Sequence, residues 1–325
     1  MFKRPGASQA FFWSSMVIRF IGGKKIAIIF ILLFLMVTVW EGVTKQVPAA
    51  ILLATGCCLA ANLVCCMISH VRRLSRWSLR QTGFIIFHAG LLVVISGGMI
   101  TYYTYSIGYV EVAEGNGFTD RRSSYNGWKQ RFGIRKGTGT QIGVKKINLS
   151  FWDNGQIKEY DNRLVIKDEH REREAVLEVN GSVRHGGLLI NLARYYGLAP
   201  HFVLQTPHGQ NSGYVYINDS SKTNTFTIPS LGYKATVTYD NITDRSVAIS
   251  VDLGEKESMT RTLSTGDTIE LGEKKLILTR ISLWNGITVV SDSGKEVAYA
   301  GFMLFLIGLS LFYYARFFRE VSTDA

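Results

Sequence analysis

The histidine at position 88 is the side chain best suited to chemistry, because it lies inside an apolar run. The run FIIFHAGLLVV covers residues 84–94 and follows Arg80 closely, so His88 lies about 12 Å along a helix from that arginine. An ionisable group at such a depth in a membrane is costly and marks a functional site. Neutral imidazole is a good iron ligand, and haem is the form of iron that dissolves in a membrane. We therefore treat His88 as a candidate haem ligand; the alternative is a neutral histidine that hydrogen-bonds across packed helices.

His70 is a second candidate ligand. It follows the apolar run 47–69 and precedes an arginine-rich loop, which puts it in the same half of a membrane as His88. The competing interpretation is an interfacial residue among lipid head groups.

The four cysteines all lie in one apolar run, at positions 57, 58, 65 and 66. On a helix Cys58 and Cys65 share a face, which is the minimum for a pair of soft metal ligands. Cysteine in lipid also serves as a small apolar residue, and that interpretation stays open. Because segment 104–296 has no cysteine, it can hold neither a disulfide nor a thiol–disulfide site.

Motifs of independent catalysis are absent from the sequence, which has no Gly-x-Ser-x-Gly elbow, glycine-rich phosphate loop or His-Glu-x-x-His helix. The mixed acidic and basic run 167–174 predicts the solvated end of a hairpin. The remaining histidines lack metal-ligand spacing and are expected to be solvated: His170, His185, His201 and His208. We predict no catalytic residue and a chain that is not catalytic alone.

Four long apolar runs must position these side chains, at 26–40, 47–69, 83–103 and 297–317. The last three have about the 20 residues that cross a ~30 Å hydrocarbon core. The first is shorter, and a cleaved signal peptide is its alternative interpretation. We predict an integral membrane protein with four transmembrane helices. Its five segments are a cytoplasmic N-terminal segment (1–25), a three-helix transmembrane region (26–103), an extracytoplasmic β-rich domain (104–296), a fourth transmembrane helix (297–317) and a cytoplasmic tail (318–325).

The net charge of +11 is explained by orientation in a membrane. Lysine and arginine concentrate before residue 26, between the second and third runs, and after the last run, and this bias predicts that those segments are cytoplasmic. Segment 104–296 is then outside and nearly neutral. The charge therefore gives no reason to expect a nucleic-acid partner, and we predict a multi-pass protein of the bacterial inner membrane with both termini in the cytoplasm.

The outer segment 104–296 has the pattern of a β protein. Short β-branched and aromatic runs alternate with turn sequences such as Asn180-Gly181 and Asn285-Gly286. The predicted strands are 109–112, 141–149, 163–166, 175–179, 213–217, 233–239, 247–251 and 274–278. We expect one mostly-β sandwich or open barrel with a single core.

A stripe of glycines predicts how the third span packs. Gly83, Gly90 and Gly97 recur every seven residues, and His88 points nearly opposite them. Small residues let helices approach closely, so we expect the stripe to pack within the protein while His88 faces a partner helix or a cofactor.

Residues 80–92 with 108–115, residues 178–197 and Asp292-Ser293-Gly294 form three stretches that resemble the ResB/CcsB family of System II cytochrome c biogenesis. Residues 80–92 with the strand 108–115 resemble the family's third span, in which a histidine starts a His-x-Gly/Ser-Leu-Leu run, and its first outer strand. Residues 178–197 resemble a later family segment. Asp292-Ser293-Gly294 resembles the Asp-Pro-Gly that precedes the last span.

The resemblance implies one subunit of a cytochrome c synthase, part of a haem lyase complex. In the family the histidine at the position of His88 is implicated in holding haem, so haem b would be bound transiently, with His70 as a weaker candidate. The partners would be a CcsA/ResC-like membrane protein and apocytochrome c, since the tryptophan-rich Trp-Trp-Asp segment of that partner is missing here. Two alternatives stay open: a haem-binding membrane anchor of a respiratory oxidoreductase, and a cofactor-free scaffold with an outer β domain.

Overall fold

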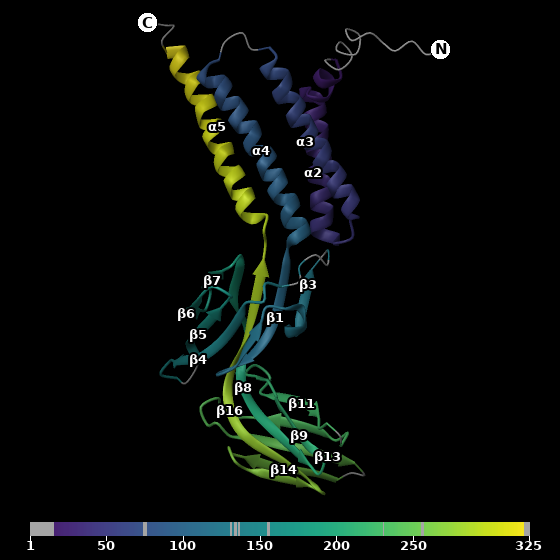
Figure 1. The fold of residues 1–325 in the computed structure, drawn as a ribbon, viewed down its shortest axis with the longest axis vertical. Coiled ribbons are helices and arrows are strands. Elements are labelled where there is room, and N and C mark those ends of the chain that lie inside the picture. The colour runs from purple at the N-terminus through teal and green to yellow at the C-terminus, as the bar shows by residue number, and fades with distance from the viewer. Residues whose placement is uncertain are drawn as a thin grey trace, which may run out of the picture. The chain divides into compact units, whose positions relative to one another are not determined.

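The computed structural model divides the chain into two compact units (Figure 1). One combines Met1–Tyr105 with Asp292–Ala325, and the other is Ser106–Ser291; we call them the helical unit and the β unit. The structure describes residues 16–73, 77–130, 132, 135, 137–154, 157–229, 231–254 and 257–321. Several basic residues used for the orientation argument, Lys3, Arg4 and Arg76 among them, lie outside the described residues.

Four long helices of the described chain are apolar enough to cross a membrane, which confirms the predicted architecture of three N-terminal spans and one C-terminal span. They are α2 (Lys24–Thr44), α3 (Ala49–Val71), α4 (Leu79–Thr104) and α5 (Lys295–Val321). The start of α4 lies before the apolar run because Ser78 is its N-cap and accepts a hydrogen bond from the Gln81 N–H at 3.4 Å.

The glycine stripe of α4 packs against α5, as predicted. A Cβ atom on Gly90 would lie 2.4 Å from the Phe305 backbone nitrogen, and one on Gly83 would lie 2.5 Å from that of Phe312. The contact is reciprocal, because a Cβ on Gly308 of α5 would lie 2.2 Å from the Phe87 nitrogen. Glycine on both helices therefore allows the two backbones to touch.

The described strands of the β unit form three antiparallel sheets. An eight-stranded sheet has the order β10-β8-β16-β1-β3, with β7 and β9 on β8 and β15 on β16. Two four-stranded sheets have the orders β2-β4-β5-β6 and β11-β12-β13-β14. The strands of the large sheet are β1 (Ser106–Ala113), β3 (Gly127–Gln130), β7 (Ser182–His185), β8 (Leu188–Thr206), β9 (Gly209–Tyr214), β10 (Ile217–Asn218), β15 (Thr268–Leu271) and β16 (Lys274–Ser291). The others are β2 (Gly117–Thr119), β4 (Gln141–Phe151), β5 (Ile157–Lys167), β6 (Glu172–Glu178), β11 (Thr223–Thr227), β12 (Lys234–Thr238), β13 (Val247–Gly254) and β14 (Glu257–Leu263).

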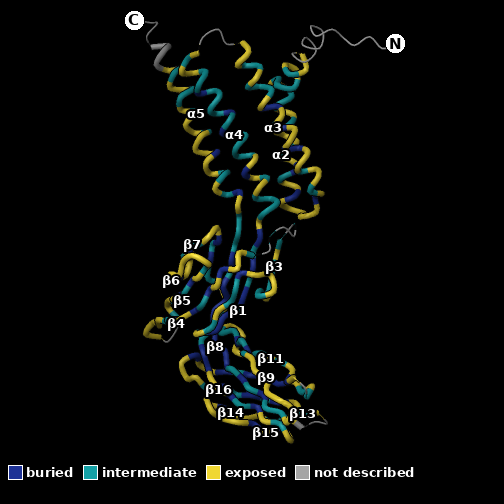
Figure 2. The backbone as a smooth tube through the Cα atoms, in the orientation of Figure 1, coloured by how far each residue is buried: buried dark blue, intermediate teal, exposed yellow. Residues whose placement is uncertain are grey.

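The expectation of a single core is wrong, because the β unit has two main hydrophobic cores. One lies between the large sheet and β12–β13 and includes Phe202, Ile249 and Leu278. The other lies between the large sheet and β4–β6 and includes Leu164 and Ile190. Figure 2 shows buried segments in both parts of the unit. The long strands β8 and β16 supply residues to both cores, and irregularities in their register accompany the change from one core to the other.

Candidate functional site

His88 lies on α4 with a fixed ring orientation. The residue is only 9% exposed. Its Nδ1 lies 2.9 Å from the backbone oxygen of Phe84, one helical turn earlier. A carbonyl oxygen can only accept, so Nδ1 carries the hydrogen and Nε2 of the neutral ring keeps its lone pair. A histidine whose second ring nitrogen donates to a carbonyl is the usual arrangement of a metal ligand.

The unprotonated nitrogen of His88, Nε2, faces helix α3. Cys66 Sγ lies 3.8 Å from His88 Nε2, so the thiol is a weak donor to that nitrogen. This pair could not be predicted from the sequence, because spacing along one chain does not give the register between two helices. His88 thus faces a neighbouring helix of its own chain, on the side of α4 away from the glycine stripe.

His70 contacts the same aromatic ring as His88. The Phe84 ring centroid is 4.1 Å from that of His70 and 3.9 Å from that of His88. The Nε2 atom of His70 is buried and has no hydrogen-bond partner among the described residues. The structure therefore brings the two candidate ligands to one place, with a phenyl ring packed against both.

The donor chemistry at this place fits haem iron on one side. His88 offers a neutral imidazole with a supported Nδ1, and Phe84 and Phe87 provide apolar rings beside it. Among the described residues no group of three or more histidine, cysteine, aspartate or glutamate side chains could hold a metal ion, and Cys57 and Cys58 are exposed on α3.

A separate cavity of about 300 Å³ lies between α2, α3 and α4. Its walls are mainly apolar and include Phe34, Leu52, Gly98 and Met99. His88 does not line it, so the cavity and the histidine pair are distinct features of the same helical unit.

The motif before the last helix has a structural role. Asp292 Oδ1 accepts hydrogen bonds from the Thr101 hydroxyl at 2.7 Å and from the N–H groups of Gly294 and Lys295 at 3.0 and 3.2 Å. A carboxylate at a helix N-terminus satisfies free N–H groups. Asp292 therefore starts α5 and connects it to the end of α4.

Two histidines of the β unit differ from the prediction. His201 is half-buried, and its Nδ1 lies 2.7 Å from the Thr279 hydroxyl oxygen. His170 and His208 are exposed, as expected. His185 is not solvated: its side chain is 6% exposed, and its Nε2 lies 2.8 Å from Asp168 Oδ2. Asp168 itself lies in the predicted hairpin end between β5 and β6, where N–H groups of His170 and Arg171 lower the pKa of its carboxyl. No motif in the sequence indicates that β7 brings His185 to this turn.

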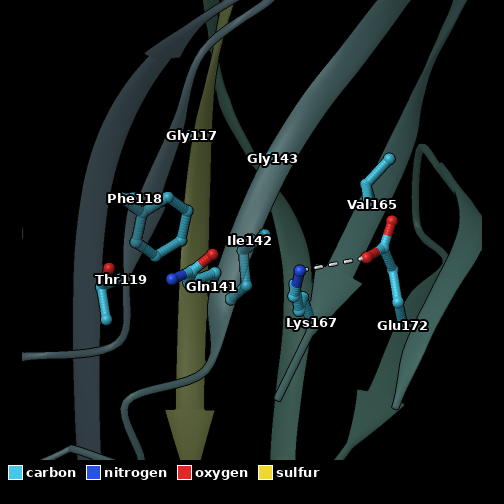
Figure 3. A pocket seen from close by; sticks show the side chains of 9 residues that line it. All are labelled: Gly117, Phe118, Thr119, Gln141, Ile142, Gly143, Val165, Lys167 and Glu172. Carbon is cyan, nitrogen blue, oxygen red and sulfur yellow. Dashed lines mark ion pairs between the residues drawn. The ribbon is translucent and has the colours of Figure 1, made fainter. Parts of the chain in front are cut away.

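A groove of about 440 Å³ lies along β2, β4 and β5 (Figure 3). Gly117 and Gly143 are opposite each other in register, so neither adds a side chain there. The polar groups at its side include Lys167 and Glu172, whose charged atoms are 3.4 Å apart. These two charges therefore pair with each other at the side of the groove.

Comparisons with known proteins found one family match and a similar solved structure. A model of the ResB-like family matches residues 75–319. A solved structure, "Cytochrome c Heme Lyase CcmF", is similar with a TM-score of 0.33 and 10% sequence identity; the match covers 88% of this chain and 34% of that chain. This chain thus spans about a third of that protein's length. No curated protein matches the sequence.

Proposed function

Because the chain belongs to the ResB-like family, we propose that it is a subunit of a membrane cytochrome c synthase that supports haem delivery and positions apocytochrome c for covalent haem attachment. Family membership supports a role in cytochrome c biogenesis, and the four apolar helices support insertion in a membrane. The β unit then lies on the extracytoplasmic side of a bacterial inner membrane, with the termini in the cytoplasm. The partner is a CcsA/ResC-like protein.

The observation that carries this proposal is the state of His88. Its Nδ1 is held by the Phe84 carbonyl, its Nε2 keeps a lone pair, and the side chain is buried in an apolar helix. Such a ligand stabilises haem iron without a charge of its own in the membrane. Haem is the cargo here, and His88 holds it transiently on its way to the apocytochrome.

The role of the chain's other groups follows from what they can do. Phe84 and Phe87 exclude water around the imidazole, and the Phe84 carbonyl fixes which nitrogen is free. The β unit supplies no catalytic side chain to the reaction; it presents a surface to the apocytochrome. Thioether bonds between haem and apocytochrome therefore form only when this chain and its partner protein are assembled in one complex.

The test is His88→Ala in the complex purified with its native partners. We expect the b-type haem absorbance to fall about tenfold or more, and haem-stained cytochrome c in the cells to fall with it. Cys66→Ala is the matched control, because it removes the contact at Nε2 but leaves the bond between Nδ1 and the Phe84 carbonyl.

Three outcomes would change the proposal. Unchanged haem in the His88→Ala complex would remove His88 from the site. A colourless wild-type complex would favour the cofactor-free scaffold. A fast, reversible redox response to quinol that is lost in both His70→Ala and His88→Ala would favour a respiratory anchor.

A further inference from the structure

Three adjacent strands of the β unit place a tyrosine, a histidine and an arginine in one row. His201 of β8 is the register partner of Tyr214 on β9 and of Arg280 on β16. We call Tyr214, His201 and Arg280 the His201 row. The row lies on the face of β8 opposite Phe202, which points into one of the two cores.

A β-bulge fixes the proton of His201. Leu278 and Arg280 pair with Phe202 and His201, so Thr279 is an extra residue in β16. The Thr279 hydroxyl donates to the His201 backbone oxygen at 3.0 Å, and His201 Nδ1 lies 2.7 Å from the same hydroxyl oxygen. Because that hydroxyl has one hydrogen and it is already used, Nδ1 is the donor and Nε2 keeps its lone pair.

The surroundings of His201 combine aromatic faces with one positive charge. The His201 and Tyr214 ring centroids are 4.6 Å apart, and the Tyr214 and Tyr216 rings stack at 6.1 Å. The Arg280 guanidinium carbon lies 5.5 Å from the Tyr214 ring centroid, and the group donates to the Tyr214 hydroxyl. Burial, and then the charge of Arg280, lower the pKa of His201, so its imidazole is neutral at neutral pH.

We propose that the His201 row is a second haem-docking site, on the β unit, for haem on its way to the apocytochrome. This inference rests on the proposed function for the identity of the ligand. His201 Nε2 binds the iron, the tyrosine rings contact the porphyrin, and Arg280 pairs with a propionate carboxylate. A surface patch that binds no metal does not need an imidazole whose tautomer is fixed, as that of His201 is.

The test is a haemin titration of the full-length chain in detergent, with His88→Ala in every variant so that the helical unit's histidine is removed. We expect this protein to bind haemin with a shift of the Soret band. Adding His201→Ala should abolish that shift and weaken binding by about 100-fold. Adding His208→Ala is the matched control, since His208 is exposed in the β8–β9 turn and should change nothing.

Two milder variants keep the test decisive if His201→Ala does not fold. Thr279→Val removes the hydroxyl that orients the imidazole and should weaken haemin about tenfold. Arg280→Gln should weaken haemin severalfold and leave the Soret position unchanged, because the iron ligand remains. Haemin binding that is identical with and without His201, or with and without Thr279, would overturn the site.

Failure of this inference can be told from failure of the proposed function. The haemin titration uses the chain alone, whereas cytochrome c assembly is measured in cells that carry the His201→Ala chain with His88 intact. If haemin binding does not depend on His201 while cells with the wild-type chain assemble cytochrome c normally, only the His201 site is rejected. His201-dependent haemin binding in a protein whose deletion leaves cytochrome c assembly intact would support the site and reject the assigned pathway.

Discussion

The buried carboxylate of Asp120 shows how single residues stabilise the β unit. Its side chain is 0% exposed; it accepts from the Tyr125 hydroxyl at 2.6 Å and the Thr138 N–H at 2.8 Å, and pairs with Arg135 at 2.5 Å. Burial raises the pKa of Asp120, but these hydrogen bonds and the Arg135 charge outweigh it, so the pKa lies below its ordinary value. Asp120→Asn should lower the free energy of unfolding by about 3 kcal/mol, measured by chemical denaturation in detergent.

The sign of the pH effect follows from the lowered pKa of Asp120. The folded carboxyl binds its proton less readily than the unfolded one, so its contribution is complete above the ordinary carboxyl pKa and disappears as pH falls through the lowered value. Asp120→Asn should therefore lose less stability than the wild type on acidification. Glu174→Gln is the control, because its ion pair with Lys145 is about 61% exposed at Glu174 and an exposed ion pair contributes little to stability. Equal acid sensitivity of wild type and Asp120→Asn would contradict this account.

At the residue scale, depth along one helix is enough to predict that His88 is a buried ionisable side chain. His88 could be singled out because an ionisable side chain in an apolar run is unusual whatever the helix packs against. The contacts of Cys66 and His201 could not be predicted from the sequence in the same way. Their partners come from another helix or from strands 13 and 79 residues away in the chain, such as Tyr214 and Arg280, and only register brings them together.

At the scale of elements, the contact between α4 and α5 depends on glycine. Gly90→Ala puts a methyl group 2.4 Å from the Phe305 backbone nitrogen, and a backbone atom cannot swing away as a flexible side chain can. We expect this variant to lose about 1–3 kcal/mol and to lower the thermal midpoint in detergent. Gly98→Ala on the same helix is the matched control, because nothing lies within 4 Å of its Cβ position. A midpoint shift of the same size in both variants would contradict the proposed packing.

Elements were predicted well where the pattern was continuous and poorly where glycine and proline interrupted it. The four helices and strands such as β4 and β13 were found from their apolar runs. The nineteen-residue β8 was missed, because Gly197 and Pro200 are typical of a break in a strand. A Cβ on Gly197 would lie 2.0 Å from the Ile217 carbonyl oxygen, so this glycine is what allows β10 to approach β8.

At the scale of the whole β unit, β8 and β16 connect two cores, where the sequence pattern predicts one. The two strands pair with each other from Leu188 with Ser291 at one end to Gln205 with Lys275 at the other. The small cluster of Ala113, Ala199 and Trp284 lies between these ends. The pairing of β8 with β16 therefore continues from one core into the other, with an irregularity between Asn285 and Ile287. We infer that the two cores unfold together, although they contain different side chains.

This inference predicts the effect of removing one fully buried side chain. Leu164→Ala makes a cavity in the core beside β4–β6, where Leu164 is 0% exposed, and should cost about 2–5 kcal/mol. If the shared strands couple the cores, amide hydrogen exchange of the full-length chain should become faster by a similar factor in β5 and in the distant β12–β13. Ile249→Ala in the other core should do the same in reverse. Faster exchange confined to the mutated core would mean that β8 and β16 join two independently unfolding parts.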